Sequence, residues 1–251
     1  MNASSQQQLV AVVSGGSSGI GKAFVARLHG EGYRVFTCAR DTAKLRQLEQ
    51  SYPGVQGFVC DVSDKASIIA FARTITELSP RIDLLISNAG GMVQVDFTQP
   101  EPISLDLTAE LRSNLEGAIN LIAAFLPNLR RAGHGSIVVV SSGYGLAPAT
   151  LAPIYSAAKA GLHSLCKSLR RQLKPQGIRL TEVVPPLVDT PATVNHAGSK
   201  LSADAVAAAA LAGLRRGRAE VYPGQARMLP LLMRLAPGIA EGVVANSLKV
   251  T

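Results

Sequence analysis

Short apolar runs alternate along the chain with longer segments in which apolar residues recur every three or four positions. The runs are Leu9–Ser14, Arg34–Cys38, Val55–Cys60, Leu84–Ser87, Ser136–Ser141 and Arg179–Val184. They are apolar on consecutive rather than alternate residues, which is typical of parallel strands buried on both faces. We therefore expect about six largely buried parallel strands.

The segments between these runs have the spacing of amphipathic helices. They are Lys22–His29, Thr42–Ser51, Lys65–Leu78, Ala109–Arg130 and Tyr155–Leu173. The composition changes after Pro191, where a polar stretch from Asn195 to Lys200 leads into an alanine-rich helix from about Ser202 to Leu214. Repeated strand–helix units with right-handed crossovers form a doubly wound parallel sheet with helices on both faces. The prediction is an α/β fold, the Rossmann type, in a single domain over residues 1–251, because no linker or repeat divides the chain.

Composition narrows the class of protein. With 47% hydrophobic and 17% charged residues, the chain is not intrinsically disordered. Its three cysteines lie far apart in apolar stretches and favour small core residues in a reducing compartment, so we expect a cytoplasmic protein. No CxxC or HExxH spacing occurs and the four histidines are scattered, so no metal site is expected.

Charge and hydropathy bear on partners. The apolar run Leu9–Val13 is too short for the core of a signal peptide, and no uncharged apolar run is long enough to span a membrane. The formal net charge of +8 favours an anionic partner, which could be nucleic acid, anionic lipid or a phosphate-bearing cofactor. Aromatic residues make up only 4% and Trp is absent, which argues against nucleic acid.

A glycine-rich loop follows the first predicted strand and opens the first helix. It reads Ser14-Gly15-Gly16-Ser17-Ser18-Gly19-Ile20-Gly21. Gly15 permits a tight turn, Gly19 lets the backbone approach a phosphate, and Gly21 allows the helix to pack closely on the strand. The exposed N–H groups and the helix dipole favour an anion. This position in a parallel sheet predicts a site for the pyrophosphate of a dinucleotide.

The tip of the second strand reads Cys38-Ala39-Arg40-Asp41 and bears on which dinucleotide binds. Arg40, assisted by the Ser17 hydroxyl, could pair with the 2′-phosphate of NADP. Asp41 is the rival, because a carboxylate here would bind the ribose 2′-hydroxyl of NAD. However, Asp41 stands where the helix Thr42–Ser51 needs an N-cap. We therefore predict NADP(H) rather than NAD(H).

Tyr155 and Lys159 are four residues apart, which places them one turn apart on one helix face. A nearby cation stabilises a phenolate, and this makes the phenol a usable proton donor. Two side chains on an ordinary amphipathic helix would give the same pattern. Ser142 lies thirteen residues before Tyr155, just after a predicted strand, where ligands of parallel sheets bind.

These motifs resemble the short-chain dehydrogenase/reductase family in order and spacing, up to about Thr190. Further matches are Asp61-Val62, Ser87-Asn88-Ala89-Gly90 and Asn114. The resemblance implies that Tyr155 protonates a substrate carbonyl oxygen as hydride arrives, and that Ser142 hydrogen-bonds the same oxygen. It implies that Lys159 holds the ribose hydroxyls and lowers the pKa of Tyr155, and that Asn114 holds a water linking Lys159 to solvent.

The resemblance also implies the rest of a cofactor site. Asp61 and Val62 would face the adenine, Asn88, Ala89 and Gly90 would pass beneath the adenosine, and Val188 and Thr190 would bind the carboxamide. Three departures from the family pattern are Ser14 for Thr, Ser87 for Asn, and Pro186 for the Gly that usually follows Pro185. Pro186 lacks an N–H and has a fixed φ, which leaves open a different course for the loop beside the nicotinamide.

The implied activity is that of an NADP(H)-dependent carbonyl reductase or alcohol dehydrogenase on a small-molecule substrate. The alternative is an NADP(H)-binding sensor without turnover, which the intact Asn114, Ser142, Tyr155 and Lys159 argue against. The resemblance assigns pocket closure to residues 187–214 and 221–251. Within the second of these, Met228–Leu235 is apolar with basic flanks and could line a pocket for a long apolar substrate, form a subunit interface or contact an anionic membrane.

Two further expectations concern the helix Tyr155–Leu173. The resemblance makes its face of small and apolar residues a subunit interface of a homodimer or homotetramer, although burial against the sheet would give the same pattern. These residues are Ala157, Ala158, Gly161, Leu162, Leu165 and Leu169. His163 is interpreted as helix packing. Tyr144 has no Lys four residues later, so it is expected to line the pocket rather than act as the acid.

Overall fold

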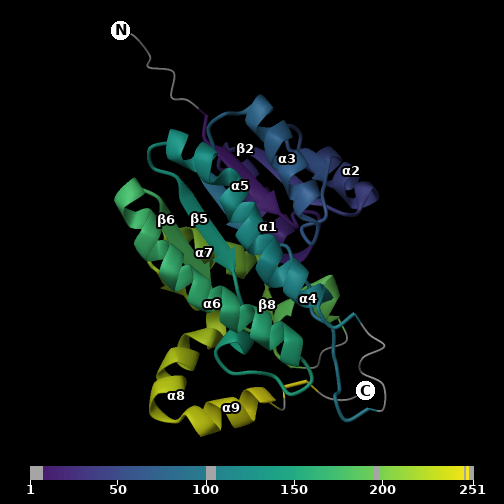
Figure 1. Cartoon of the computed structure of the whole chain (residues 1–251), viewed down its shortest axis with the longest axis vertical. Coiled ribbons are helices and arrows are strands. Elements are labelled where there is room, and N and C mark those ends of the chain that lie inside the picture. Colours follow the sequence, from purple (N-terminus) through teal and green to yellow (C-terminus); the bar gives the residue numbers. More distant parts are fainter. Residues whose placement is uncertain (1–7, 100–105, 195–197, 246, 249–251) are drawn as a thin grey trace.

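The computed structural model of the protein describes residues 8–99, 106–194, 198–245 and 247–248. Its main feature is a seven-stranded parallel sheet in the order β3-β2-β1-β4-β5-β6-β9 (Figure 1). The strands are β1 (Val10–Ser14), β2 (Arg34–Ala39), β3 (Gln56–Val59), β4 (Leu84–Ser87), β5 (Ser136–Val140), β6 (Arg179–Val183) and β9 (Glu220–Val221). The strand order reverses between β1 and β4, and ligands of such sheets bind at this crossing, outside the carboxyl ends of the strands.

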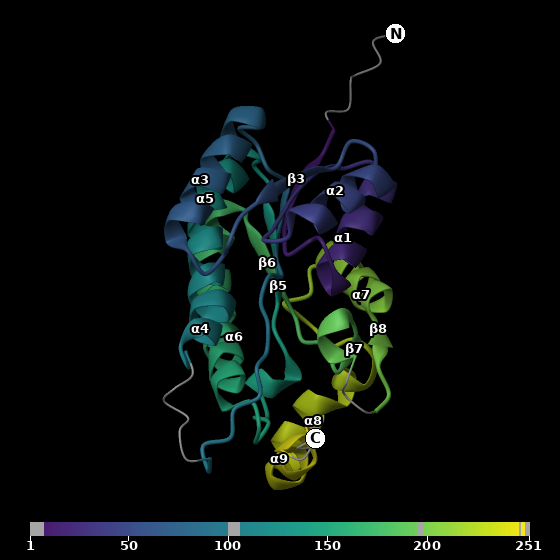
Figure 2. The same ribbon diagram turned by 90° about the vertical axis from the view of Figure 1, so that its right-hand side faces the viewer.

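Helices cover both faces of the sheet (Figure 2). One face carries α1 (Gly19–Gly30), α2 (Thr42–Ser51) and α7 (Ala203–Arg215), and the other carries α3 (Lys65–Leu78), α5 (Gly117–Arg131) and α6 (Pro153–Leu173). Alternate residues of β1 enter two separate cores. Val10 and Val12 pack with the α3, α5 and α6 side, and Ala11 and Val13 with the α1 and α7 side. The predicted doubly wound parallel sheet is confirmed.

The predicted elements are found with few differences. The bounds of α2, α3 and β4 match the prediction, and the other five predicted strands and α7 differ by one residue at one or both ends. Two helices begin earlier than predicted, α1 by three residues and α6 by two. The predicted helix Ala109–Arg130 is wrong as a continuous α-helix: it consists of α4 (Ala109–Leu111), a π-helical turn η2 (Arg112–Glu116) and α5. The expectation of burial is also wrong for β3, because it lies at the edge of the sheet and leaves Val59 62% exposed.

Three very short strands were not predicted. β9 adds only two residues to the sheet, beside β6, and β7 (Val188–Asp189) pairs with β8 (Leu201–Ser202) outside it. Parts of three regions discussed from the sequence lie outside the described residues: 1–7, 195–197 with His196, and 246 with 249–251. Within the described ranges, no helix combines the length and apolarity needed to cross a membrane.

The C-terminal chain leaves the sheet after β9. A 3-10 turn η6 (Gly224–Met228) leads into α8 (Leu229–Leu235) and α9 (Pro237–Ala245). Both helices lie at the end of the molecule where α6 begins (Figure 1). A cleft of about 810 Å³ lies between α9 and the loop that precedes α6. The C-terminal segment thus returns to the edge of the sheet where ligands are expected.

Candidate active site

The glycine loop joins β1 to α1 and presents an uncapped helix N-terminus. Gly15 and Gly19 have φ of +70° and +51°, a conformation that glycine adopts without strain. A Cβ atom at Gly21 would come within 2.1 Å of the Gly15 carbonyl oxygen, so only glycine fits there. Ser18, the N-cap of α1, makes no side-chain capping hydrogen bond, and the first turn has no acidic residue. These features fit the pyrophosphate of a dinucleotide.

Ser14 ties the glycine loop to the loop after β4. Its hydroxyl donates to the Ile86 carbonyl at 3.3 Å and accepts from the backbone N–H groups of Asn88 and Ala89, each at 3.0 Å. The Asn88 amide in turn donates to the Ser14 carbonyl at 3.1 Å. The structure therefore brings Asn88 and Ala89 against the glycine loop, and Ser14, which stands in place of the family Thr, uses its hydroxyl to hold them.

Arg40, Asp41 and Asp61 lie at the neighbouring tips of β2 and β3. Asp41 accepts from the Lys44 backbone N–H at 3.0 Å and caps α2, as predicted. Burial alone would raise the pKa of Asp61, but hydrogen bonds from Ser63 and the positive charge of Arg40 lower it. Arg40 itself is exposed beside the first turn of α2.

Ser142, Tyr155 and Lys159 come together after β5. Ser142 begins the 3-10 turn η3 (Gly143–Gly145), and its Oγ accepts from the Tyr144 backbone N–H at 3.2 Å. Tyr155 lies in the first turn of α6, where it interacts with the Ser142 hydroxyl. Lys159 is only 4% exposed. Its Nζ donates to the Val140 carbonyl at 3.2 Å and lies 5.4 Å from the centre of the Tyr155 ring.

Burial disfavours the charged forms of both groups on α6. It raises the pKa of Tyr155 to about 12, although the Ser142 hydrogen bond opposes the shift. Burial likewise lowers the pKa of Lys159 to about 8, against the opposing effects of Cys166 and Glu182. The lowered pKa of Tyr155 that the resemblance implies is therefore not produced by the described side chains alone, because burial outweighs the hydrogen bond with Ser142.

Asn114 lies in the π-helical turn η2, a feature that often marks functional sites. Its Nδ2 donates to the Gly91 carbonyl at 2.8 Å and to the Glu110 carbonyl at 3.0 Å. Its Oδ1 is buried and has no donor among the described residues. Gly90 makes room for this oxygen, because a Cβ there would lie 2.3 Å from it. A buried acceptor of this kind fits the water that was predicted at Asn114.

Apolar side chains line the space next to Tyr155. The Tyr144 ring contacts the Tyr155 ring edge to face, with the ring centres 6.2 Å apart, and its hydroxyl lies 2.9 Å from the Ser247 hydroxyl. The cluster around these rings consists of Met92, Ala149, Leu151, Ala152 and Leu248. Sequence reasoning assigned the C-terminal segment to this region but missed Met92 and Leu151, because neither stands in a recognisable motif.

The loop after β6 reaches both ends of the candidate site. Pro185 precedes the unusual Pro186 and accepts from the Gly143 N–H at 3.3 Å, so its carbonyl is next to Ser142. Val188 is buried in β7. Thr190 begins a capping box with Thr193, and its methyl group would lie 3.1 Å from a Cβ placed on Gly19. Both residues predicted to bind the carboxamide are thus on the segment that passes the glycine loop.

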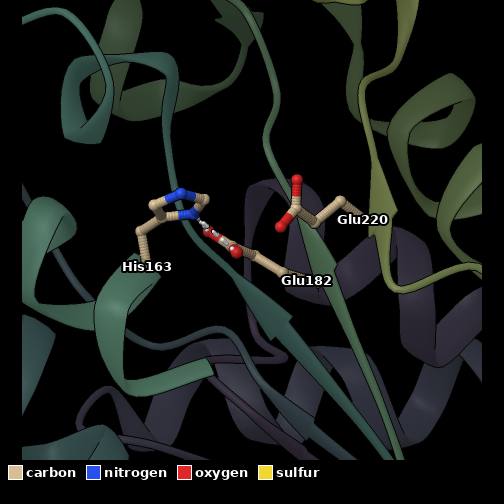
Figure 3. Close-up of side chains that lie close together, drawn as sticks. All are labelled: His163, Glu182 and Glu220. Atoms are coloured by element: carbon tan, nitrogen blue, oxygen red, sulfur yellow. Dashed lines mark hydrogen bonds and ion pairs between the residues drawn. The ribbon is translucent and has the colours of Figure 1, made fainter. Parts of the chain in front are cut away.

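His163 has a specific partner that the packing interpretation missed (Figure 3). Its Nδ1 lies 2.8 Å from Oε2 of Glu182, which is fully buried in β6. Glu220 of β9 is next to this pair (Figure 3). A pairing between positions 163 and 182 has no signal in the sequence, because it depends on how α6 packs across β6.

Comparison with known proteins agrees with this geometry. The family model for short chain dehydrogenases matches residues 9–200, which include every catalytic and cofactor-binding residue predicted from the sequence. The chain belongs to the short-chain dehydrogenase family. It is therefore an oxidoreductase, and enzymes of this family use NAD or NADP.

Three proteins of known sequence or structure are similar to this short-chain dehydrogenase. An uncharacterized oxidoreductase of Bacillus subtilis, DltE, is 34% identical over 180 residues, which are 71% of each chain. A tropinone reductase homologue of Arabidopsis thaliana is 34% identical over 195 residues, or 75% of this chain and 71% of the relative. A short-chain dehydrogenase from Burkholderia cenocepacia, solved in complex with NADP, superimposes with a TM-score of 0.83 at 26% identity and covers 94% of this chain and 97% of its own.

Proposed function

We propose that this short-chain dehydrogenase is an NADP(H)-dependent carbonyl reductase, reversible as an alcohol dehydrogenase, that acts on an apolar ketone or acyl-type carbonyl. The observation that carries the proposal is the meeting of Ser142, Tyr155 and Lys159 at the carboxyl end of β5. The whole chain, 1–251, would act as one domain.

The proposed roles follow from the hydrogen bonds available at the site. When bound, the nicotinamide supplies hydride to the carbonyl carbon or accepts it in oxidation. The Tyr155 hydroxyl gives its proton to the carbonyl oxygen, and the Ser142 hydroxyl donates to the same oxygen and stabilises the charge that develops. Lys159 would hold the ribose hydroxyls and favour the Tyr155 phenolate. A water on Asn114 Oδ1 would return a proton through Lys159 to Tyr155.

Two observations support the choice of cofactor. Arg40 is exposed at the tip of β2, and the competing carboxylate of Asp41 is engaged as the N-cap of α2 and in an ion pair with Lys44 at 3.3 Å. The Burkholderia cenocepacia relative was solved with NADP. Ser17 lies in the same loop and would assist at the 2′-phosphate, while Asp61 and Val62 would face the adenine.

The substrate class rests on the lining next to Tyr155. Met92, Tyr144, Leu151 and Leu248 offer an apolar surface to a substrate whose carbonyl lies at the Tyr155 hydroxyl. In α8, Leu229 comes within 3.3 Å of a Cβ built on Gly143, so the segment Met228–Leu235 contributes to this wall. Four other apolar side chains of that segment are exposed and would remain free for a second copy of the chain or a membrane surface. They are Met228, Leu231, Leu232 and Leu235.

We also expect a homodimer or homotetramer in a cytoplasmic setting. The interface expected on α6 would have to exclude Ala158 and Leu162 of the face named from the sequence, because both pack inside the chain. Ala157 of that face is exposed, as are Ala160 and Ser164, so these residues would form the interface.

The test is oxidation of NADPH, beside NADH, with ketones and 3-oxoacyl compounds of graded chain length. We expect turnover with NADPH that increases with chain length. Turnover restricted to small polar ketones would contradict the apolar wall. Tight NADPH binding without turnover on any member of the panel would favour the alternative, a sensor on the same scaffold.

Replacing Arg40 by Gln is expected to lower kcat/KM with NADPH by about 30-fold, because a charge-assisted pair with the 2′-phosphate is lost. With NADH the same change is expected to stay within about threefold, since no phosphate is present. Arg46→Gln, at an exposed position of α2, is the matched control and should leave both values unchanged. A parent enzyme that prefers NADH would refute the role of Arg40.

A further inference from the structure

Glu182 is a carboxylate enclosed in the interior of the protein. It lies in β6 opposite Val139 of β5, and none of its surface is exposed. Burial of a carboxylate is costly unless it is paired. Its oxygens lie 2.8 and 3.1 Å from Nδ1 of His163, which extends from α6 toward β6 (Figure 3). The cost of burying the Glu182 carboxylate suggests that it has a function.

Lys159 shares the same space between α6 and the sheet. It precedes His163 by one turn, so both side chains project from one face of the helix. The Lys159 ammonium donates to the Val140 carbonyl, and Val140 pairs with Val183, the residue after Glu182. The Glu182 carboxylate therefore lies on the strand next to the one that holds the ammonium. In a buried setting, opposite charges on neighbouring strands interact more strongly than they would in water.

We propose that Glu182 is a positioning residue that keeps Lys159 protonated, and that His163 orients its carboxylate for this purpose. The proposal rests on the proposed function, since it assigns Lys159 a role in turnover. The reaction needs the ammonium form of Lys159, both to bind ribose hydroxyls and to stabilise the Tyr155 phenolate. Burial works against that form, and a buried anion on the neighbouring strand counteracts burial.

The other titratable groups around Lys159 do not replace Glu182. They are Tyr155, His163, Cys166 and Arg170 on α6, Tyr144 in η3, Glu110 on α4, Glu220 on β9, and Tyr222 after it. Glu110 accepts from the Val93 backbone N–H at 2.6 Å, and burial raises its pKa. Burial raises the pKa of Cys166 and of Tyr222, so both stay neutral near neutral pH. Glu220 Oε1 lies 3.8 Å from Nη1 of Arg170, and its Oε2 accepts from the Tyr222 hydroxyl at 2.7 Å. The positive charge of Arg170 therefore offsets the negative charge of Glu220.

A metal ion is a weaker explanation of the same cluster. His163, Glu182 and Glu220 offer ligand atoms within 4.8 Å of one another (Figure 3). However, the His163 Nδ1 already contacts Glu182, and Glu220 already has Tyr222 and Arg170. An ion would have to displace these contacts, so the cluster is better explained as an internal hydrogen-bonded pair.

The test is the pH dependence of kcat/KM for the Glu182→Gln variant. This substitution keeps the shape of the side chain and removes its charge. Near pH 8.5, kcat/KM of the variant is expected to fall about fivefold below the parent, because Lys159 loses its proton at lower pH. Near pH 6.5 the two enzymes should differ by less than about twofold, since Lys159 is protonated in both. Glu220→Gln is the matched control and should follow the parent at both values. An equal loss at all pH values would mean that Glu182 is only structural.

The His163→Gln variant and the pH dependence of NADPH binding test the role of Glu182 in two further ways. His163→Gln retains the Glu182 charge, so its activity should decline at the same pH as the parent or at a higher pH; a decline at lower pH would overturn the proposal. The pH dependence of NADPH binding, followed by fluorescence, reports on Lys159 without turnover. If the parent proves inactive, the proposed function fails, yet weaker binding of NADPH to Glu182→Gln at pH 8.5 alone would still support the role of Glu182. Unchanged binding would contradict it.

Discussion

Tyr155→Phe is expected to lower kcat for carbonyl reduction by about 1,000-fold, because the proton donor is removed while the ring remains. The Tyr155 hydroxyl interacts with Ser142, and Lys159 Nζ lies 5.4 Å from the Tyr155 ring centre, whereas the hydroxyl of the neighbouring Tyr144 lies 2.9 Å from that of Ser247. Stopped-flow or steady-state oxidation of NADPH with the best substrate of the panel measures the loss. The dissociation constant for NADPH should change less than about threefold, since the phenol gives little binding energy in the ground state.

Tyr144→Phe provides the matched control for Tyr155→Phe. The two rings touch edge to face, and each substitution removes one phenol hydroxyl from the same apolar cluster. Because Tyr144 directs its hydroxyl to Ser247, its loss is expected to lower kcat by less than about tenfold. If Tyr144→Phe were the more damaging change, the acid would be Tyr144 and the assignment from the Tyr-x-x-x-Lys spacing would be wrong.

Features that depend on neighbouring residues could be predicted from the sequence. Consecutive apolar residues predicted the buried strands, and Asp41 was assigned as the N-cap of α2 because it directly precedes a helical pattern. The order of strand, glycine loop and helix placed Gly19 at an uncapped helix end. In each case the physical cause lies within a few residues of the position concerned, so the one-dimensional pattern contains it.

Features that depend on packing could not be predicted in this way. The π-helical turn around Asn114 interrupts a stretch whose apolar spacing is that of a continuous helix. Glu182 stands in an otherwise apolar strand, and only the packing of α6 over β6 brings His163 to it. β9 has two residues and no pattern of its own, and it is defined by pairing with β6. The wall made by Met92, Leu151 and Leu248 likewise joins three segments that are far apart in the sequence.

The buried polar groups of the candidate site come at a cost to stability. Lys159 is 4% exposed, and burial lowers its pKa from the ordinary value of 10.5 to about 8. Asn114 adds a buried oxygen without a donor among the described residues. A site built from such groups is stabilised less than an apolar core of the same volume would be. The free energy of unfolding should therefore reflect this cost independently of any assay of turnover.

Lys159→Met is expected to raise the free energy of unfolding by about 2 kcal/mol at pH 7 while it lowers kcat by about 100-fold. At pH 7 Lys159 is protonated in the folded and the unfolded chain, so the folded parent bears the full cost of the buried charge. The shift from 10.5 to about 8 corresponds to roughly 3 kcal/mol, and the lost hydrogen bond to Val140 offsets about 1 kcal/mol of the gain.

The difference in unfolding free energy between Lys159→Met and the parent should depend on pH. Between about pH 8 and 10.5 the unfolded chain still holds a proton on Lys159 that the folded chain has released, so the stability of the parent rises with pH. The advantage of Lys159→Met should therefore shrink from pH 8 upward. Urea unfolding at pH 7, 8.5 and 9.5 measures it, and this range avoids the titration of Tyr155, whose raised pKa acts with the opposite sign above pH 10.

Lys167→Met is the matched control, because Lys167 lies on the exposed face of the same helix, α6. It should change stability by less than about 0.5 kcal/mol, without dependence on pH over this range. A Lys159→Met variant that is less stable than the parent at pH 7 would show that the ammonium is held by compensating interactions stronger than its burial. The buried carboxylate of Glu182 is the first candidate for such compensation, so in a Glu182→Gln background the gain from Lys159→Met should be larger than in the parent, since the unpaired ammonium would then bear more of the cost.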